Sequence, residues 1–255
     1  MFGPEVDEQI QAHALEAFPH ECCGVVRNGL YERLANNDPN PAEAFDFDRM
    51  VLLDPAVQAI VHSHPGGPAW PSALDMEQQL ATDLVWGLVA TDGESCQPVM
   101  WWGPGVPMPP LIGRDFRHGP SGSDGKGDCY ALVRDWYRAE RGLILPEVPR
   151  DHEWWNKGQS LYTDYLAPQG FSTIPLDQLQ PGDGLLMHVL SPVPNHAAIY
   201  MGNGLILHQL PNRLSRHDPL GRWHNLVTHV LRAPLPPPEL LPQPPAPESG
   251  KEGPG

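Results

Sequence analysis

Short hydrophobic runs that end at proline and glycine predict strands in the first half of the chain. One such run ends at residues 60–61, and Pro65 with the glycines after it terminates the predicted strand. Side chains alternate between the two faces of a strand, so His62 and His64 are expected on the same face. Residues 73–84 consist of good helix formers and predict a helix after this strand.

In the second half, hydrophobic residues recur at helical spacing before a second strand pattern begins. The segment 128–137 follows a loop rich in glycine and serine and predicts a helix whose first turn contains Cys129. The hydrophobic positions of this helix are Leu132, Val133, Trp136 and Tyr137. Residues 195–208 have the pattern of two strands around a Gly-Asn-Gly turn at 202–204, which predicts a hairpin.

Each strand of this hairpin contains one histidine, and the turn decides whether the two can meet. A two-residue turn at 203–204 would place His208 opposite Ile199, which faces away from His196. A three-residue loop would pair His208 with Ala198, on the same face as His196. A site that uses both histidines therefore requires the longer loop or a bulge.

Length and composition predict two compact domains. A chain of 255 residues can form two hydrophobic cores of ordinary size. We place the first domain at residues 1–105, a Pro-rich linker at 106–111 and the second domain at 112–233. Residues 234–255 combine many prolines with few hydrophobic residues, which predicts a disordered tail.

Charge and targeting signals narrow the class of protein. The formal net charge is −15, from 16 Lys and Arg against 31 Asp and Glu, so no nucleic-acid partner is expected. The N-terminus lacks the basic and hydrophobic regions of a secretory signal, and no run is long enough for membrane insertion. We therefore expect the protein in the cytoplasm of the producing cell, where its four cysteines do not predict a disulfide framework.

The two histidines of the first predicted strand indicate a metal site. Asp75 lies in the first turn of the following helix and can reach back towards His62 and His64. Two imidazoles and a carboxylate can bind one zinc ion and leave a fourth position open, as in catalytic zinc sites. The Ser72 and Asp75 spacing also fits a capping box, which needs no metal. Joined at this spacing, the residues favour the metal site, and Ser72 can serve both purposes.

The pattern His62-x-His64-x7-Ser72-x2-Asp75 resembles the signature of the JAMM (MPN-type) metallopeptidases. The resemblance implies a cytidine-deaminase-like α/β fold with His62, His64 and Asp75 as zinc ligands. It also implies Glu21 as general acid/base, because a glutamate precedes a Cys-Gly step into a strand there, and Ser72 as a residue that helps to hold the oxyanion. Without the resemblance, Glu21 would be assigned as a solvated acid between a helix and a strand.

Cys129 has the position of a nucleophile. In the first turn of a helix, the backbone dipole favours the thiolate and lowers the pKa of the thiol. Asp128 opposes this effect as a nearby negative charge and is expected to be the N-cap. The alternative is a buried, unreactive cysteine, which is what a lone cysteine would suggest.

A cysteine at a helix start, then a histidine on one strand and a polar residue on the next, resembles the NlpC family of cysteine peptidases. The resemblance implies a papain-like α+β fold in which Cys129 is the nucleophile, His196 the base and His208 the residue that orients the base. A Pro-Gly-Asp turn at 181–183 precedes the histidine strand, as in that family. His188 is a rival base, but it lacks the Ala-Ile-Tyr-x-Gly context that follows His196.

The order of the two domains resembles the tail tip assembly proteins of lambda-like siphophages and is more specific than either motif. This resemblance implies phage tail tip proteins as partners, and a virion whose tail tip carries the protein out of the cell. It also implies an endopeptidase that cuts the stem peptide of peptidoglycan. Residues 119–127 depart from the family as an insertion, for which a mobile flap is one interpretation.

Two other functions remain open from the sequence. The chain could be chiefly a structural tail assembly factor with catalysis secondary, although intact motifs in both halves argue against a pure scaffold. A JAMM isopeptidase that acts on protein tags would account for the first half alone and leave the cysteine domain unexplained. The eight tryptophans fit either a glycan or peptide groove or the hydrophobic cores, and the cores are the default expectation.

Overall fold

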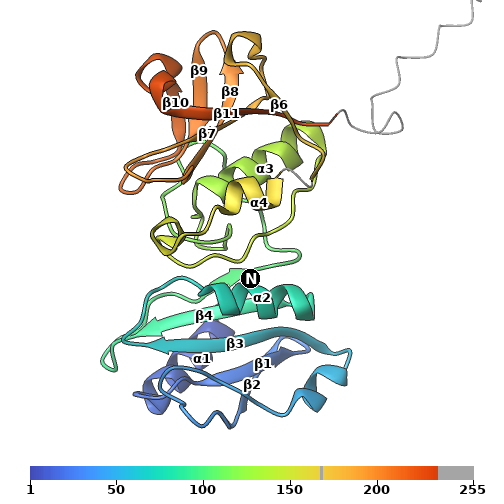
Figure 1. Ribbon diagram of the computed structural model, residues 1–255. Helices are drawn as coiled ribbons and strands as arrows, with labels where there is room; N and C mark the ends of the chain where they lie inside the picture. Colours follow the sequence, from blue (N-terminus) through green and yellow to red (C-terminus); the bar gives the residue numbers. More distant parts are fainter. Residues whose placement is uncertain (167–168, 235–255) are drawn as a thin grey trace, which may run out of the picture.

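The computed structural model describes residues 1–166 and 169–234, which form two lobes that lie one above the other in Figure 1. Within these residues, no helix has both the length and the apolar surface needed to span a bilayer. The tail predicted at 234–255 lies outside the described residues except for Pro234.

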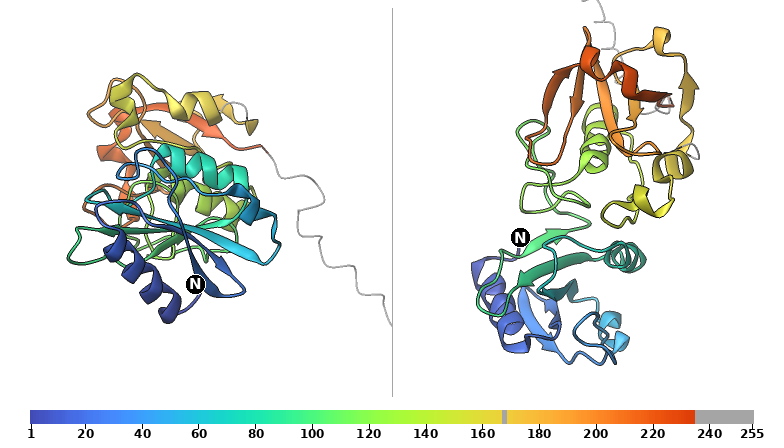
Figure 2. Two further views of the ribbon diagram at one scale, coloured as in Figure 1. Left: turned by 90° about the horizontal axis from the view of Figure 1, so that it is seen from below. Right: turned by 60° about the vertical axis from the view of Figure 1, so that its left-hand side comes forward.

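The first lobe is a sheet with strand order β2-β1-β3-β4-β5, in which β3 and β4 are parallel and the other pairs antiparallel. Its elements are helices α1 (Pro4–Ala17) and α2 (Ala73–Thr82), a short 3-10 helix (Arg49–Leu53), and strands β1 (Cys23–Arg27), β2 (Leu30–Leu34), β3 (Val57–Pro65), β4 (Val85–Thr91) and β5 (Met100–Trp102). Helices α1 and α2 cover opposite faces of the sheet (Figure 2, right). The expected α/β class is therefore confirmed for this lobe.

The two faces of this sheet have separate hydrophobic cores. Cys22 packs in the core beneath α1, and its neighbour Cys23 packs in the core on the α2 face, as alternation along a strand requires. Helix α2 forms the crossover between the parallel strands β3 and β4. The helix ends at Thr82 rather than Leu84, because Asp83 adopts a left-handed conformation (φ 52°) that stops helical hydrogen bonding.

The second lobe places a helix against an antiparallel sheet with strand order β10-β9-β8-β7-β11-β6. Within the described residues, its helices are α3 (Cys129–Arg141), α4 (Leu161–Leu166) and four short 3-10 helices (Trp154–Lys157, Leu176–Gln178, Leu220–Arg222 and His224–Leu226). Its strands are β6 (Ser172–Ile174), β7 (Gly184–Met187), β8 (His196–Gly202), β9 (Leu205–His208), β10 (Arg216–Pro219) and β11 (Val227–Arg232). Helix α3 packs on β8, and the expected α+β class is confirmed.

The hairpin of β8 and β9 has the bulge that a two-histidine site requires. Its turn contains two residues, Asn203 and Gly204, both with positive φ. A register shift between Tyr200 and Gly202 inserts one extra residue into β8. Because of this bulge, His208 pairs with Ala198 and lies on the same face as His196.

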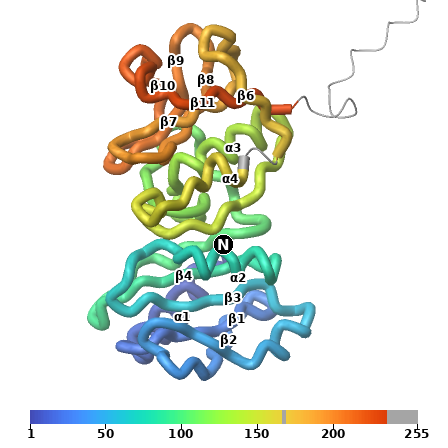
Figure 3. The backbone as a smooth tube through the Cα atoms, viewed as in Figure 1, coloured from blue at the N-terminus to red at the C-terminus, as the bar shows by residue number. Residues whose placement is uncertain are grey.

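The inserted loop 119–127 lies in the green part of the backbone tube, at the boundary between the two lobes (Figure 3). The backbone N–H of Ser123 donates to the carbonyl of Trp101 at 2.9 Å, and the N–H of Trp101 donates to Ser123 Oγ at 3.0 Å. Trp101 belongs to β5, the edge strand of the first sheet, so the loop covers backbone groups that an edge strand exposes. These hydrogen bonds tie the loop to the first sheet and argue against its interpretation as a mobile flap.

Candidate metal site and candidate thiol site

Three side chains of the first lobe converge on a triangle of ligand atoms. The Nε2 atoms of His62 and His64 are 3.2 Å apart, and the Asp75 carboxylate oxygens lie 3.3 Å and 3.4 Å from them. A tetrahedral zinc ion with ligands at about 2.0–2.2 Å holds neighbouring ligand atoms about 3.3 Å apart. The three residues therefore have the spacing that zinc needs.

Strand β3 and the loop that follows it orient the two histidines. His64 Nδ1 lies 2.9 Å from the carbonyl oxygen of Pro68, so this nitrogen donates and Nε2 keeps a lone pair for a ligand. His62 is fully buried, and its ring stacks on Phe45 at 4.8 Å between centroids. Within the described chain, His62 Nδ1 has no hydrogen-bond partner, whereas Nε2 points to His64 and Asp75.

Ser72 and Asp75 form the predicted capping box as well as part of this triangle. Ser72 Oγ accepts from the Asp75 N–H, and the Ser72 N–H and Oγ–H both donate to Asp75 Oδ2 at 2.7 Å. Burial alone would raise the pKa of Asp75, but the neighbouring His62 and His64 lower it below its usual range. The cap interpretation is confirmed, and it does not compete with ligand binding because Oδ1 remains directed at His62.

Glu21 lies at the corner between α1 and β1, beside the triangle but outside it. It is buried, contrary to the solvated acid that its position alone suggested. Burial raises the pKa of the Glu21 carboxyl, and the charges of His62 and His64 partly oppose this rise. A carboxyl with a raised pKa can hold and release a proton closer to neutral pH than an exposed glutamate.

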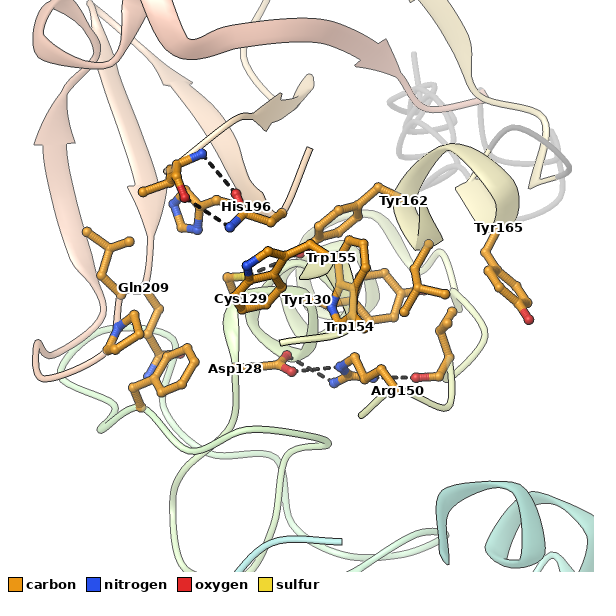
Figure 4. A pocket seen from close by; sticks show the side chains of 17 residues that line it. Asp128, Cys129, Tyr130, Arg150, Trp154, Trp155, Tyr162, Tyr165, His196 and Gln209 are labelled. Carbon is orange, nitrogen blue, oxygen red and sulfur yellow. Dashed lines mark hydrogen bonds and ion pairs between the residues drawn. The ribbon is translucent and has the colours of Figure 1, made fainter. Parts of the chain in front are cut away.

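The second site is a cavity of about 180 Å³ at the start of α3 (Figure 4). Cys129 is the first residue of α3 and His196 is the first residue of β8, and both line the cavity. His188, the rival base, does not line it. Figure 4 shows Gln209 at one end of the cavity and Tyr165 at the other.

Three adjacent strands carry a line of hydrogen bonds away from His196. His196 Nε2 lies 3.0 Å from His208 Nδ1, and His208 Nε2 lies 3.2 Å from Asp218 Oδ2. Arg216 donates to the same Asp218 oxygen at 3.0 Å. With Nε2 of His196 engaged, Nδ1 is the ring nitrogen left to exchange a proton in the cavity.

The electrostatics of the thiol differ from the sequence prediction. Burial, together with the charge of Asp128, raises the pKa of Cys129 to about 11, so the helix dipole does not prevail. Burial and the neighbouring His208 lower the pKa of His196 to about 3. Thiol and imidazole are therefore both neutral in this state, and Cys129 Sγ shares a hydrogen bond with Tyr162 Oη at 3.2 Å.

A buried ion pair fixes the N-terminus of α3 and was not predicted. Asp128 is the N-cap, as expected, and accepts from the Ala131 N–H at 2.9 Å. The Arg150 guanidinium also donates to both Asp128 carboxylate oxygens at 2.7 Å and 3.0 Å. His118 Nε2 lies 2.9 Å from the backbone carbonyl oxygen of Arg150, so the segment before α3 is tied to the same residue. Arg150 comes from a loop, and no spacing motif in the sequence marks it.

The tryptophans divide between the two roles that the sequence left open. Trp101 and Trp102 are buried in the cores of the first lobe. Trp154 and Trp155 line the thiol cavity with Tyr162 and Tyr165, which gives the cavity an aromatic wall (Figure 4). The sequence showed the Trp154-Trp155 pair but not that it lies beside Cys129.

Comparison with known proteins agrees with both halves. The family model described as prokaryotic homologs of the JAB domain matches residues 4–102, and that of the NlpC/P60 family matches residues 113–232. Tail tip assembly protein K of Escherichia phage lambda is 43% identical over 162 residues, which cover 64% of this chain and 74% of that protein. The chain belongs to the tail tip assembly protein K family.

A second family member covers almost the whole chain. Tail tip assembly protein K of Escherichia phage N15 is 32% identical over 236 residues, which cover 88% of this chain and 93% of that protein. Among solved structures, the NlpC/p60 domain of the peptidoglycan hydrolase SagA has 18% sequence identity and a TM-score of 0.35, and the match covers 48% of this chain and 89% of that domain.

Proposed function

We propose that this K-family protein is a tail tip component whose second lobe is a thiol endopeptidase that cuts the stem peptide of peptidoglycan. The observation that carries the proposal is the common cavity of Cys129 and His196, from which His208 and Asp218 extend as a hydrogen-bonded line. Residues 1–105 and 112–233 act as two domains joined by the linker 106–111. Phage tail tip proteins are the partners of the assembled protein.

Cys129 and His196 are both neutral before the reaction, and this determines its first step. His196 takes the proton of Cys129 as Sγ attacks the substrate carbonyl, because a thiol with a pKa of about 11 does not ionise beforehand at neutral pH. The imidazolium that forms is stabilised through His208 by the Asp218 carboxylate. His196 then gives the proton to the leaving amine, and water hydrolyses the thioester to restore the thiol.

The first lobe is proposed to bind zinc through His62, His64 and Asp75. Zinc, when bound, would polarise a carbonyl or water. Glu21 would transfer protons beside it, and Ser72 would both orient Asp75 and help to hold the oxyanion. Two roles are proposed for the first lobe: it processes a tail protein during assembly, or it is a docking unit that retains its metal. A protein-tag isopeptidase is disfavoured, because it gives the thiol site no role.

A structural role in assembly is the second candidate, and the name of both relatives, tail tip assembly protein K, favours it. The separating experiment compares Cys129→Ala and His64→Ala in particle assembly and in digestion of purified peptidoglycan. Loss of digestion with normal tails for Cys129→Ala is the expected result. Normal digestion with failed tails in both variants would establish the assembly role instead.

Two substitutions serve as matched controls in this experiment. Cys96→Ala removes a cysteine of the first lobe that lies outside both sites. His13→Ala removes a histidine of α1, on the sheet face opposite α2. Both should assemble tails and digest peptidoglycan at the wild-type rate, so a defect in either would indicate general damage to the fold.

A further inference from the structure

A second hollow continues from the thiol cavity and has no role in the mechanism above. It has a volume of about 400 Å³ and shares Leu210 and Pro211 with the cavity. Its other lining residues are Arg213, Arg222, Trp223 and Leu226. Leu210 follows Gln209, which Figure 4 shows at the end of the cavity away from Tyr165. The hollow therefore extends the cleft at the end opposite its aromatic wall.

The wall of this hollow lies beside both histidines of the thiol site. The Trp223 ring lies 4.8 Å from the His208 ring and 6.1 Å from the His196 ring, measured between centroids. A peptide whose carbonyl lies between Cys129 and His196 spans about 3.3–3.6 Å per residue when extended. Because Trp223 lies close to His196, a group seated in the hollow belongs to a residue near the cleaved bond.

The hollow carries uncompensated positive charge in an acidic protein. Arg213 and Arg222 are both exposed, and neither forms an ion pair with any described residue. The neighbouring Arg216, by contrast, is bound to Asp218. Burial is the main cause that lowers the pKa of His208, and the charges of Arg216 and Arg213 contribute to it, so Arg213 lies near the histidine that orients the base.

The chemistry of the lining selects a carboxylate on an aliphatic stem. A guanidinium presents a planar fork that matches a carboxylate with two hydrogen bonds, and it is only weakly hydrated. Trp223, Leu226 and Pro211 offer an apolar wall for the carbon chain that bears the acid. Peptides from peptidoglycan carry such carboxylates, and a net charge of −15 would otherwise repel them.

We propose that Arg213 and Arg222 form a subsite that binds a free carboxylate of the substrate peptide beside the cleaved bond. The proposal rests on the peptidase function proposed for the second lobe. It assigns to these arginines the selection of acidic over amidated substrate peptides.

Binding and turnover of one peptide pair test the subsite separately from the function. The pair consists of a synthetic stem tripeptide with free carboxylates and the same peptide with carboxamides, titrated calorimetrically into full-length Cys129→Ala. We expect amidation to weaken binding about ten- to hundredfold, as for loss of a hydrogen bond to a charged group. In Arg213→Ala/Arg222→Ala made in this background, the two peptides should bind with affinities equal within about twofold.

Arg138→Ala is the matched control, since Arg138 is another exposed arginine without an ion pair among the described residues and lies on α3 away from this hollow. It should keep the full preference for the acidic peptide. Equal binding of the two peptides to Cys129→Ala, no binding of either, or an unchanged preference in the double arginine variant would overturn the subsite. Absent turnover by the wild type with an intact binding preference would refute the peptidase and leave the subsite standing.

Discussion

The two candidate sites each pair two histidines, but the pairs are arranged in different ways. In the first lobe, two Nε2 atoms of His62 and His64 face each other at 3.2 Å, with the Asp75 carboxylate at the third corner. In the second lobe, His196 Nε2 faces Nδ1 of His208, whose other nitrogen faces a carboxylate. The first pair closes a triangle, and the second forms a line.

This difference separates a site that needs a ligand from one that does not. In the line, one proton lies in each contact: His196 Nε2–H can donate to His208 Nδ1, and His208 Nε2–H can donate to Asp218, so only His196 Nδ1 is left to face the cavity. In the triangle, His64 Nδ1 is committed to the Pro68 carbonyl, and the remaining lone pairs converge with a carboxylate. A proton on His62 Nε2 can be donated to only one of these neighbours at a time, whereas a cation between them binds all three. The first lobe should therefore gain stability from metal, and the second should not.

Zinc should produce the largest effect that separates the two sites. Saturation of the metal-free protein at about 1,000 times the dissociation constant should add about 4 kcal/mol to the free energy of unfolding of the first lobe. Calorimetric unfolding scans with zinc and with a chelator measure this change. The His64→Ala variant should lose the increase, because two ligands remain, and Cys129→Ala should keep it. An equal increase in both variants would show that zinc binds elsewhere.

Asp218→Asn should give the next largest effect, confined to the second site. Asn can still accept from His208 but lacks the charge that stabilises an imidazolium, so kcat should fall about ten- to hundredfold with KM nearly unchanged. Burial lowers the pKa of His208 and the Asp218 carboxylate raises it, so the substitution should lower this pKa further. The acidic limb of the kcat profile should shift towards lower pH.

The control for this prediction is Asp115→Asn, which neutralises an exposed carboxylate outside the hydrogen-bonded line. It should leave both kcat and the pH profile as in the wild type. Asp218→Asn should also keep the zinc-induced stabilisation, since Asp218 belongs to the other lobe. A rise in KM with an unchanged pH profile would instead indicate that Asp218 only maintains the shape of the cleft.

The same contrast explains which parts of the two sites the sequence could predict. His62 and His64 are two residues apart on one strand, and Asp75 lies in the first turn of the next helix, so local geometry brings them together. The meeting of His196 and His208 depends on a bulge, which the sequence allowed as one of two alternatives. Local spacing is therefore a stronger predictor of a site than pairing between strands.

Residues that reach a site through tertiary contacts were not predictable from their local pattern. Asp218 joins the line because β10 pairs with β9, and Tyr162 and Arg150 come from segments between α3 and the sheet. Burial of Cys129 was likewise not predictable from local sequence, because it is a property of the whole lobe whereas the helix dipole is a local effect. Burial raises the pKa of Cys129, where the dipole alone was expected to lower it. Both fold classes, by contrast, were implied by the resemblance of the two motif sets to known families, and the observed element order fits them.

The ionisation of Cys129 gives the smallest expected effects, and two substitutions should change it in opposite directions. Asp128 raises the pKa of the thiol, so Asp128→Asn should lower this pKa and increase the thiolate fraction. Tyr162 lowers the pKa through its hydrogen bond, so Tyr162→Phe should raise it. Alkylation of Cys129 by iodoacetamide at pH 8 should become about two- to tenfold faster in the first variant and slower by a similar factor in the second.

The pH profile and the identity of the modified cysteine make this measurement specific. In the wild type, the rate should rise about tenfold per pH unit from pH 8 and level off near the pKa of about 11. Cys22 and Cys23 also have raised pKa values, so peptide mass spectrometry must assign the label to Cys129. His64→Ala should leave the rate unchanged. Faster labelling in both Asp128→Asn and Tyr162→Phe would mean that each opens the cavity to the reagent, because electrostatics alone requires opposite signs.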